Sequence, residues 1–225
     1  MSCLFISGGG DVVTSQVFDQ AYINALQWWK NILYIPWAFH PTRYPSCQAR
    51  IDTIFPQKDW YNVSIISEND TIIVKDLIKY DGLYIWWGNT YRLLSLIRKT
   101  WFENVIQEFV KLNKPIYWGS AGAIILWKEI HTAADLNIMK LNIDETLWCN
   151  YFNHYSIFCH YKGKEDWEIQ EYIKNYKIPV IALPEWVGMY SISEEYRVGW
   201  QWFVTIFSLS WWITQYNPWD RVNLI

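Results

Sequence analysis

An α/β fold, a three-layer sandwich with a mostly parallel central sheet, is predicted by two patterns in the 225-residue sequence. Short apolar runs alternate with longer amphipathic segments between residues 3 and 183, as strands alternate with helices in β-α-β units. Runs such as Ile32-Leu33-Tyr34-Ile35 are apolar throughout, which is typical of strands buried on both faces. The length fits one domain, so we expect residues 1–225 to form a single unit.

Each element follows from its local pattern. Apolar runs predict strands at residues 3–7, 32–37, 62–67, 82–85, 115–118, 156–159 and 180–183. Amphipathic segments predict helices at residues 13–27, 42–55, 75–79, 91–99, 101–112, 121–130 and 167–175. Residues 190–225 alternate as antiparallel strands do, which predicts a C-terminal β-hairpin or edge strands.

Charge and cysteine content exclude several classes of protein. The formal net charge is -3 and no run of like charge occurs, so no nucleic-acid partner is expected. No apolar run is long enough to span a bilayer, so no membrane partner is expected. The four cysteines are widely spaced without a C-x-x-C pair, which favours free thiols in a reducing compartment and a cytoplasmic location.

A nucleophile elbow is indicated by residues 114–126. The apolar run Pro115-Ile116-Tyr117-Trp118 enters the small-residue corner Gly119-Ser120-Ala121-Gly122, and a helix-compatible apolar run leaves it. A strand-to-helix turn of this kind exposes a serine hydroxyl above a sheet, so Ser120 is the candidate nucleophile. Trp118 stands where the G-x-S-x-G pattern requires glycine.

A base and an acid are expected on the same rim as Ser120. The carboxyl ends of parallel strands meet at one edge of a sheet, and His160 and Glu185 each follow a predicted strand there. His160 is therefore the candidate base and Glu185 the carboxylate that orients it. Asp135 is the alternative acid. The other histidines are predicted in a proline-bounded loop, at a helix end and in a polar turn: His40, His131 and His154.

Two other features carry weaker predictions. Gly8-Gly9-Gly10 follows the first strand but lacks the spacing of a dinucleotide-binding loop, so a plain loop is favoured over a phosphate site. The spacing of His131, Asp135, His154 and His160 matches no known set of metal ligands, so no metal is expected.

Taken together, these landmarks resemble the peptidase E (aspartyl dipeptidase) family of serine peptidases, whose fold is related to class I glutamine amidotransferases. The resemblance extends from about residue 4 to residue 190. It rests on the order and spacing of Phe5-Ile6-Ser7-Gly8-Gly9-Gly10, Leu33-Tyr34-Ile35-Pro36, Asp81-Gly82-Leu83-Tyr84-Ile85-Trp86-Trp87-Gly88-Asn89-Thr90, Gly119-Ser120-Ala121-Gly122-Ala123, Cys159-His160-Tyr161 and Ala182-Leu183-Pro184-Glu185.

The resemblance implies a function and a site. Ser120, His160 and Glu185 would form a catalytic triad, Gly88 and Ala121 would donate the two oxyanion N–H groups, and Asn89 would line the substrate site. Short peptides, including those with an N-terminal aspartate, would be the substrates, and no cofactor would be needed. The chain would be a monomer or homodimer. No arginine lies between His160 and Glu185, so Lys162 and Lys164 are the candidate cations for an aspartate.

Tryptophan is abnormally abundant, with 17 Trp against 10 Gly. It stands where the resemblance implies glycine, at Trp86, Trp87, Trp118 and Trp186 and also at Trp101, Trp127 and Trp148. Trp28-Trp29 and Trp219 occupy positions where a helix stop and a turn favour glycine. We hypothesise that many of these codons are UGA and are translated as glycine in the source lineage. Indoles at 86 and 87 should crowd the oxyanion loop, and an indole at 118 should strain the elbow.

Two alternatives remain open at this point. A non-catalytic amidotransferase-like domain could bind a small ligand or a partner chain with the same fold. A carbohydrate-binding protein would instead use solvent-facing indoles. Labelling of Ser120 by a fluorophosphonate separates the hydrolase from both.

Overall fold

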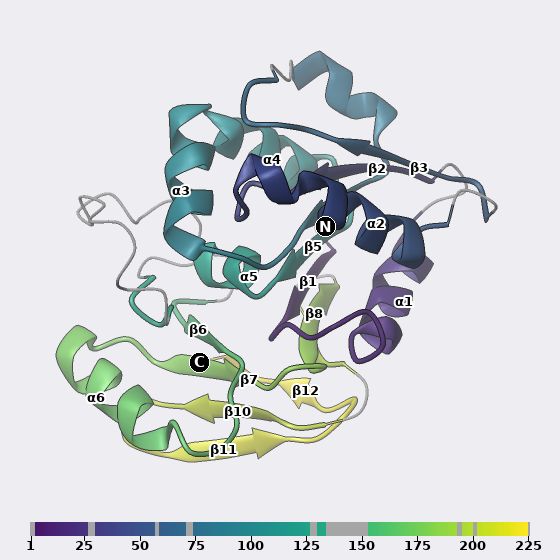
Figure 1. Ribbon diagram of the computed structural model, residues 1–225. Helices are drawn as coiled ribbons and strands as arrows, with labels where there is room; N and C mark the ends of the chain where they lie inside the picture. The colour runs from purple at the N-terminus through teal and green to yellow at the C-terminus, as the bar shows by residue number, and fades with distance from the viewer. Residues whose placement is uncertain are drawn as a thin grey trace.

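The computed structural model describes residues 3–26, 30–56, 59–70, 74–126, 130–133, 153–192, 195–199 and 202–224. It contains two sheets, a large one of eight strands and a smaller one of four (Figure 1). The smaller sheet and its helix lie below the large sheet in this view. The large sheet is the central sheet that the sequence predicts, whereas the smaller sheet was not predicted.

The large sheet has a parallel part and an antiparallel part. Its order is β12 (Arg221–Val222), β9 (Glu195–Val198), β8 (Gly188–Ile192), β1 (Leu4–Ser7), β5 (Ile116–Gly119), β4 (Gly82–Ile85), β2 (Lys30–Ile35) and β3 (Tyr61–Ile65). Five neighbouring strands of this order pair in parallel: β1, β5, β4, β2 and β3. β8, β9 and β12 add antiparallel pairs at the other side. The mostly parallel core and the antiparallel C-terminal strands are therefore as predicted.

The smaller sheet brings the strand before His160 beside the strand before Glu185. Its order is β11 (Ile213–Tyr216), β10 (Val204–Phe207), β7 (Val180–Leu183) and β6 (Ser156–Cys159). β6 and β7 are parallel, with Cys159 opposite Leu183. β10 pairs with β7 in the antiparallel sense, so part of the C-terminal segment completes this sheet. Helix α6 (Asp166–Tyr176) is the crossover between β6 and β7.

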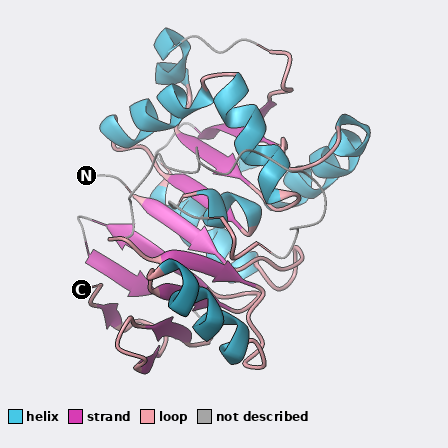
Figure 2. Cartoon of the chain, turned by 90° about the vertical axis from the view of Figure 1, so that its left-hand side faces the viewer, coloured by secondary structure: helices cyan, strands magenta, loops and turns pink. Residues whose placement is uncertain are grey.

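Helices cover both faces of the large sheet, as Figure 2 shows from the side. The helices are α1 (Gln16–Ala25), α2 (Tyr44–Ile54), α3 (Thr90–Lys99), α4 (Phe102–Lys111) and α5 (Ala121–Ile125), with 3-10 turns η1 (Pro41–Arg43) and η3 (Val74–Lys79). Alternate residues of a strand point to opposite faces. Accordingly, Leu33 and Ile35 pack in the same core as α3 and α4. Tyr34 packs in a second core with α1 and α2.

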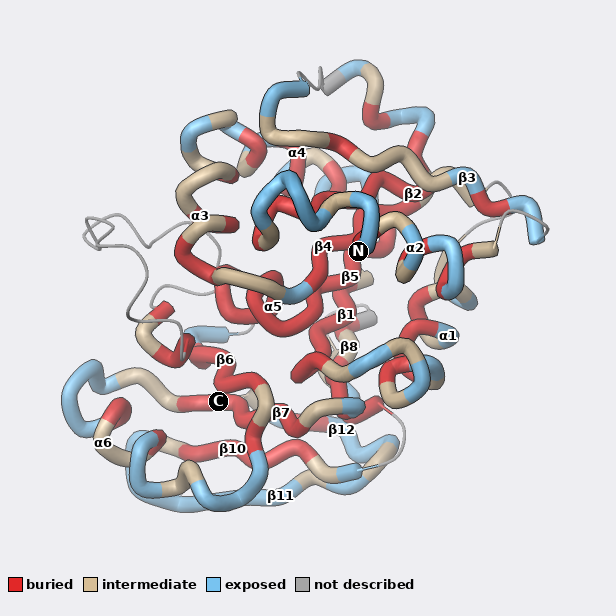
Figure 3. Tube along the Cα trace, viewed as in Figure 1, coloured by how far each residue is buried: buried red, intermediate tan, exposed pale blue. Residues whose placement is uncertain are grey.

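The buried residues form a continuous interior along the strands (Figure 3). The second core is unusually aromatic, and Tyr84 stacks on Tyr117 with ring centroids 4.4 Å apart. A third, smaller core joins α6 to the four-stranded sheet through residues such as Ile169, Ile173 and Val180. The helix layers hold the strands of the large sheet rigidly, which fixes the corner that follows β5.

Two expected helices are shorter than the sequence pattern indicates. The first begins at Gln16 because Oδ1 of Asp11 accepts hydrogen bonds from the N–H groups of Val13 and Thr14, which closes a turn there. The helix after Ser120 ends at Ile125, and residues 127–129 lie outside the described residues. In the described part of the chain, no helix has both the length and the apolarity to cross a membrane.

Candidate active site

Ser120 lies at a strained corner between β5 and α5. Its φ is 49° and its ψ is -108°, a conformation that is costly for a residue with a side chain. Hydrogen bonds hold the corner, because Ser120 N donates to Ser7 O at 2.9 Å and Ile124 N donates to Ser120 O at 3.0 Å. Strain of this kind is typical of a nucleophile elbow. The predicted elbow is therefore present.

The side chains of His160 and Glu185 extend a hydrogen-bonded line from this serine. Ser120 Oγ lies 2.7 Å from His160 Nε2. On the other side of the ring, His160 Nδ1 lies 3.1 Å from Glu185 Oε1. Both distances are within hydrogen-bond reach, as required of a nucleophile, a base and an orienting acid. Three residues predicted from separate strand ends are thus brought together.

The residues at the end of β1 are hydrogen-bonded to the segments that follow β5, β6 and β7. Ser7, the last residue of β1, accepts at its carbonyl oxygen the bond from Ser120 N, and Gly8 O accepts one from His160 N at 3.2 Å. Gly9 O accepts one from Trp186 N at 3.0 Å, beside Glu185. We call residues 7–10 the clamp loop. It holds the backbone of Ser120, of His160 and of Trp186, the neighbour of Glu185.

Position 9 of the clamp loop requires glycine. A Cβ atom on Gly9 would lie 2.5 Å from Cε1 of His160, well inside contact distance, and its φ of 111° is unfavourable for other residues. The imidazole therefore rests directly against the backbone of Gly9. Sequence reasoning treated the three glycines as a plain loop and missed this role. Their position after the first strand, on the rim of Ser120, was the available signal.

Of the two expected oxyanion donors, Ala121 directly follows Ser120 and Gly88 lines the same cleft. Ala121 is the first residue of α5, where backbone N–H groups are not used by the helix. Gly88 follows β4 with a φ of 140°, and a Cβ there would lie 2.6 Å from the carbonyl oxygen of Ala38. Gly88 also lines the cleft that contains Ser120 and His160.

This serine cleft has a volume of about 470 Å³. It is lined by Trp87, Gly88, Thr90, Ser120, Ile124, Thr132, Ala133, Phe158, Cys159, His160, Glu165 and Glu168. Among these described residues there are two carboxylates and no lysine or arginine. The cleft wall therefore combines apolar and neutral polar residues with an acidic edge formed by Glu165 and Glu168.

Comparison with known families identifies the chain. The model of peptidase family S51 matches residues 4–198, which is most of the sequence. This protein belongs to peptidase family S51. Members of this family are serine-type peptidases, so this S51 peptidase is a hydrolase, and the resemblance to peptidase E is confirmed.

Solved structures support the fold of the S51 peptidase. A candidate peptidase E protein from Listeria monocytogenes EGD-e has a TM-score of 0.65 at 19% identity, over 89% of this chain and 99% of that one. A peptidase from an acI-B1 Actinobacterium has a TM-score of 0.75 at 13% identity, over 99% and 97% of the two chains. The expected amidotransferase-like α/β fold is confirmed.

A shorter sequence match covers one part of the chain. The pyridoxal 5'-phosphate synthase subunit PdxT of Brevibacillus brevis (strain 47 / JCM 6285 / NBRC 100599) is 39% identical over 70 residues. These residues are 31% of this S51 peptidase and 37% of that relative, so the chain matches little more than a third of its length.

The remaining predicted residues of the S51 peptidase lie as follows. Asn89 is the N-cap of α3, where its Oδ1 accepts a hydrogen bond from Arg92 N at 2.7 Å, so its substrate contact stays a prediction. Lys162 lines a separate cavity beside Glu185. Asp135 lies outside the described residues, as do Trp28, Trp29, Trp127 and Trp148.

The other three histidines are engaged elsewhere. His40 caps η1 through a hydrogen bond from Thr42 N. The ring of His131 stacks on Tyr176 at 4.9 Å between centroids, and His154 lies in a turn with a φ of 69°. In the ranges that the structure describes, no three His, Cys, Asp or Glu side chains gather as metal ligands would.

Cys159 is a second potential nucleophile close to Ser120. Its Sγ lies 3.6 Å from the carbonyl oxygen of Ser120. Burial raises the pKa of this thiol well above its ordinary value, because the thiolate loses its hydration. The sulfur therefore stays protonated and weakly nucleophilic near neutral pH.

The tryptophans near the site affect it differently from what the sequence suggests. Trp118 lies within β5, is fully buried and is not among the residues with positive φ, so the expected backbone strain there is absent. Its indole N–H and that of Trp86 are instead buried without a hydrogen-bond partner. Trp86 packs flat against Gly119, whereas Trp87 lines the serine cleft.

Proposed function

We propose that this S51 peptidase hydrolyses short peptides with a Ser120-His160-Glu185 triad. The observation that carries the proposal is the continuous line of contacts, 2.7 Å from Ser120 Oγ to His160 Nε2 and 3.1 Å from His160 Nδ1 to Glu185 Oε1. A serine hydroxyl becomes a useful nucleophile when an oriented imidazole removes its proton. The family provides the reaction class, and this geometry supports the assignment of roles.

The reaction follows in two halves. Nε2 of His160 takes the proton of Ser120 as Oγ attacks the scissile carbonyl carbon, and the N–H groups of Gly88 and Ala121 stabilise the oxyanion. The imidazolium, held by Glu185, then donates its proton to the leaving amine as the C–N bond breaks. Water attacks the acyl-enzyme with the same base, and the acid product leaves with Ser120 restored.

The size and charge of the serine cleft support small substrates. A volume of about 470 Å³ is in the range of pockets that hold one small molecule, so a dipeptide or tripeptide fits better than a folded protein. The acidic edge formed by Glu165 and Glu168 opposes a substrate aspartate. We therefore propose peptides with neutral or basic N-terminal residues ahead of the Asp-X peptides that the resemblance suggests.

A cytoplasmic location is part of the proposal. The described cysteines, Cys3, Cys47 and Cys159, are free thiols, which supports a reducing compartment. We propose a monomer or homodimer whose partners are its peptide substrates rather than nucleic acids or membranes, consistent with the net charge of -3.

A fluorophosphonate probe tests the central assignment. We expect covalent labelling of one peptide that contains Ser120, and hydrolysis of a panel containing Ala-Leu, Lys-Leu and Asp-Leu. Ser120→Ala should abolish both, whereas Ser208→Ala, at an exposed hairpin turn, should change neither. Labelling that survives Ser120→Ala would overturn the triad. Absence of labelling in a well-folded chain would favour a ligand-binding domain.

A further inference from the structure

Left-handed backbone is concentrated at tryptophans in this chain. Among the described residues, eleven that are not glycine have positive φ, and five of these are Trp60, Trp101, Trp186, Trp211 and Trp219. Their φ values lie between 57° and 74°. A side chain makes this region unfavourable, and the residues that tolerate it best are glycine, asparagine and aspartate. The accumulation of tryptophan there therefore requires an explanation.

Three of the five positions are turns with a defined requirement. Trp219 is the third residue of the turn Asn217-Pro218-Trp219-Asp220, in which Asp220 N donates to Asn217 O at 3.1 Å. Proline second and a left-handed residue third define a type II turn, where glycine is standard. Trp186 is likewise third in a turn closed by Val187 N and Pro184 O at 3.4 Å.

The hairpin between β10 and β11 has the same requirement. Trp211 N donates to Ser208 O at 3.1 Å, and Ser208 N donates to Trp212 O at 2.9 Å. This is a three-residue hairpin loop whose last residue is left-handed and forms a bulge, a position dominated by glycine.

The ends of two further elements repeat the pattern. Trp101 follows Thr100, the C-cap of α3, with a φ of 57°, and its N–H donates to Arg98 O at 3.1 Å. Glycine is the usual left-handed residue directly after a helix C-cap. Trp60 has a φ of 69° in the turn that leads into β3.

The indoles at these positions gain little burial in return for the backbone strain. Trp60, Trp101, Trp211 and Trp219 are between 52% and 88% exposed, and Trp186 is 39% exposed. Trp37 is the opposite case. It is 1% exposed, its φ is not positive, its indole N–H donates to Ile66 O at 2.8 Å, and its ring packs on Phe102. The buried and hydrogen-bonded environment of Trp37 favours tryptophan, whereas the exposed environments of the other five residues do not.

We propose that the natural polypeptide carries glycine at positions 60, 101, 186, 211 and 219. Each codon would be UGA, which one genetic code reads as tryptophan and another reads as glycine. The codon of Trp37 would be UGG, which encodes tryptophan in both. The inference depends on backbone geometry and is independent of the proposed catalytic function.

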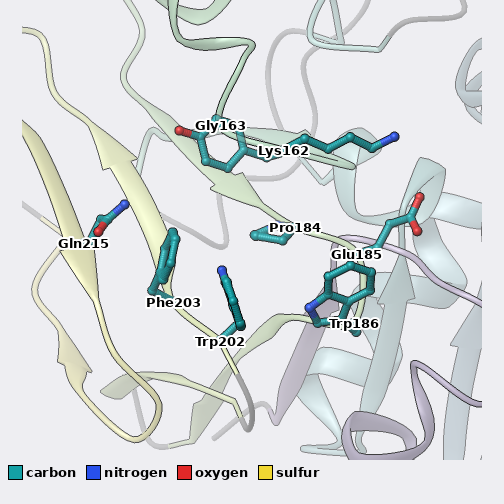
Figure 4. A pocket seen from close by; sticks show the side chains of 9 residues that line it. Lys162, Gly163, Pro184, Glu185, Trp186, Trp202, Phe203 and Gln215 are labelled. Carbon is teal, nitrogen blue, oxygen red and sulfur yellow. The ribbon is translucent and has the colours of Figure 1, made fainter.

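Glycine at 186 changes the surroundings of Glu185. Trp186 and Trp202 line a cavity of about 320 Å³ beside this carboxylate, and Figure 4 shows Glu185 and Trp186 next to each other there. Without the indole of residue 186, this cavity becomes wider and more open toward Glu185.

The gene and the natural protein test the proposal directly. We expect UGA at the five codons and UGG at codon 37, and peptide masses from the natural protein that contain glycine at the five positions and tryptophan at 37. UGG, or a tryptophan mass, at any of the five would overturn the proposal. Trp37 serves as an internal control, because its side chain is satisfied where it lies.

A recombinant pair tests the physical basis. The five-glycine variant should melt about 10–20 °C above the chain with tryptophan, because five strained residues are relieved. The matched control is Trp167→Gly, Trp202→Gly and Trp212→Gly, three exposed tryptophans without positive φ. It should melt lower, since glycine there only adds freedom to the unfolded chain. A five-glycine variant that melts no higher than the tryptophan chain would contradict the inference.

Discussion

The corner at Ser120 and the turn at Trp211 are both left-handed, but their surroundings differ. Ser120 is 5% exposed, its N–H is bonded to Ser7 O, and its hydroxyl contacts His160. Trp211 also has a positive φ, 67°, but it lies in an exposed hairpin loop with 54% of its surface in solvent. Strain persists where surrounding contacts enforce it. The comparison teaches that a strained residue indicates function only where its side chain has partners that use its position.

Replacing Ser120 with glycine should abolish most of the activity, whereas replacing Trp211 with glycine should leave activity unchanged. Ser120→Gly should lower kcat at least 10³-fold, because the nucleophile is lost. The same change should raise the free energy of unfolding by about 1 kcal/mol, because glycine adopts positive φ without steric cost. Trp211→Gly should give a similar gain in stability with unchanged kcat. Peptidase assays and urea denaturation measure both, and a loss of stability in Ser120→Gly would break the comparison.

The next effect concerns the acid that orients the imidazole. Glu185→Gln keeps the shape of the side chain but removes the charge that stabilises the imidazolium, so kcat should fall between about 10² and 10⁴-fold. Glu195→Gln, in β9 and remote from the triad, is the matched control and should retain activity. Equal kcat in Glu185→Gln and the parent chain would remove Glu185 from the mechanism.

The clamp loop offers a sharper test of enforced geometry. Gly9→Ala should displace the imidazole, because the new Cβ would lie 2.5 Å from Cε1 of His160. A displacement of about 1 Å can cost on the order of 10² in rate. Gly163→Ala is the control, since Gly163 also has positive φ, 84°, but no atom lies within 4 Å of the added Cβ. Loss of kcat in both variants alike would mean that backbone strain, and not contact with the imidazole, is responsible.

The smallest expected effect concerns the thiol beside the serine. Burial raises the pKa of Cys159, so at pH 8 the fraction of reactive thiolate is negligible. Iodoacetamide at pH 8 should therefore leave peptidase activity unchanged over an hour. Denatured protein, in which the thiol regains its ordinary pKa, should be alkylated at Cys159, as mass spectrometry can verify. Rapid inactivation of the native enzyme would contradict the contrast between the two nucleophiles.

Local signals predicted a large part of the fold. The strands at residues 82–85, 156–159 and 180–183 have the predicted bounds, because buried apolar runs between turn residues are decided locally. The proximity of Ser120, His160 and Glu185 was also predicted, since each follows such a run. The assumed reason, one shared sheet edge, was wrong, because β5 belongs to the large sheet and β6 and β7 to the smaller one.

Non-local pairing accounts for most of what the sequence did not predict. β7 pairs with β10, more than twenty residues later, and this pairing completes the second sheet. The apolar run at 180–183 contains no signal that tells whether this strand pairs within the large sheet or within the smaller one. The role of Gly9 was also hidden, because it depends on an imidazole 151 residues further along the chain.

The clamp loop also determines when this enzyme can first act. Its carbonyl groups accept hydrogen bonds from the N–H groups of Ser120, His160 and Trp186. Most of the polypeptide must therefore leave the ribosome before the side chains of His160 and Glu185 can take their places beside Ser120. Under the proposed mechanism, a nascent chain therefore lacks an assembled triad until its synthesis is nearly finished, so unfinished chains would not cleave peptides.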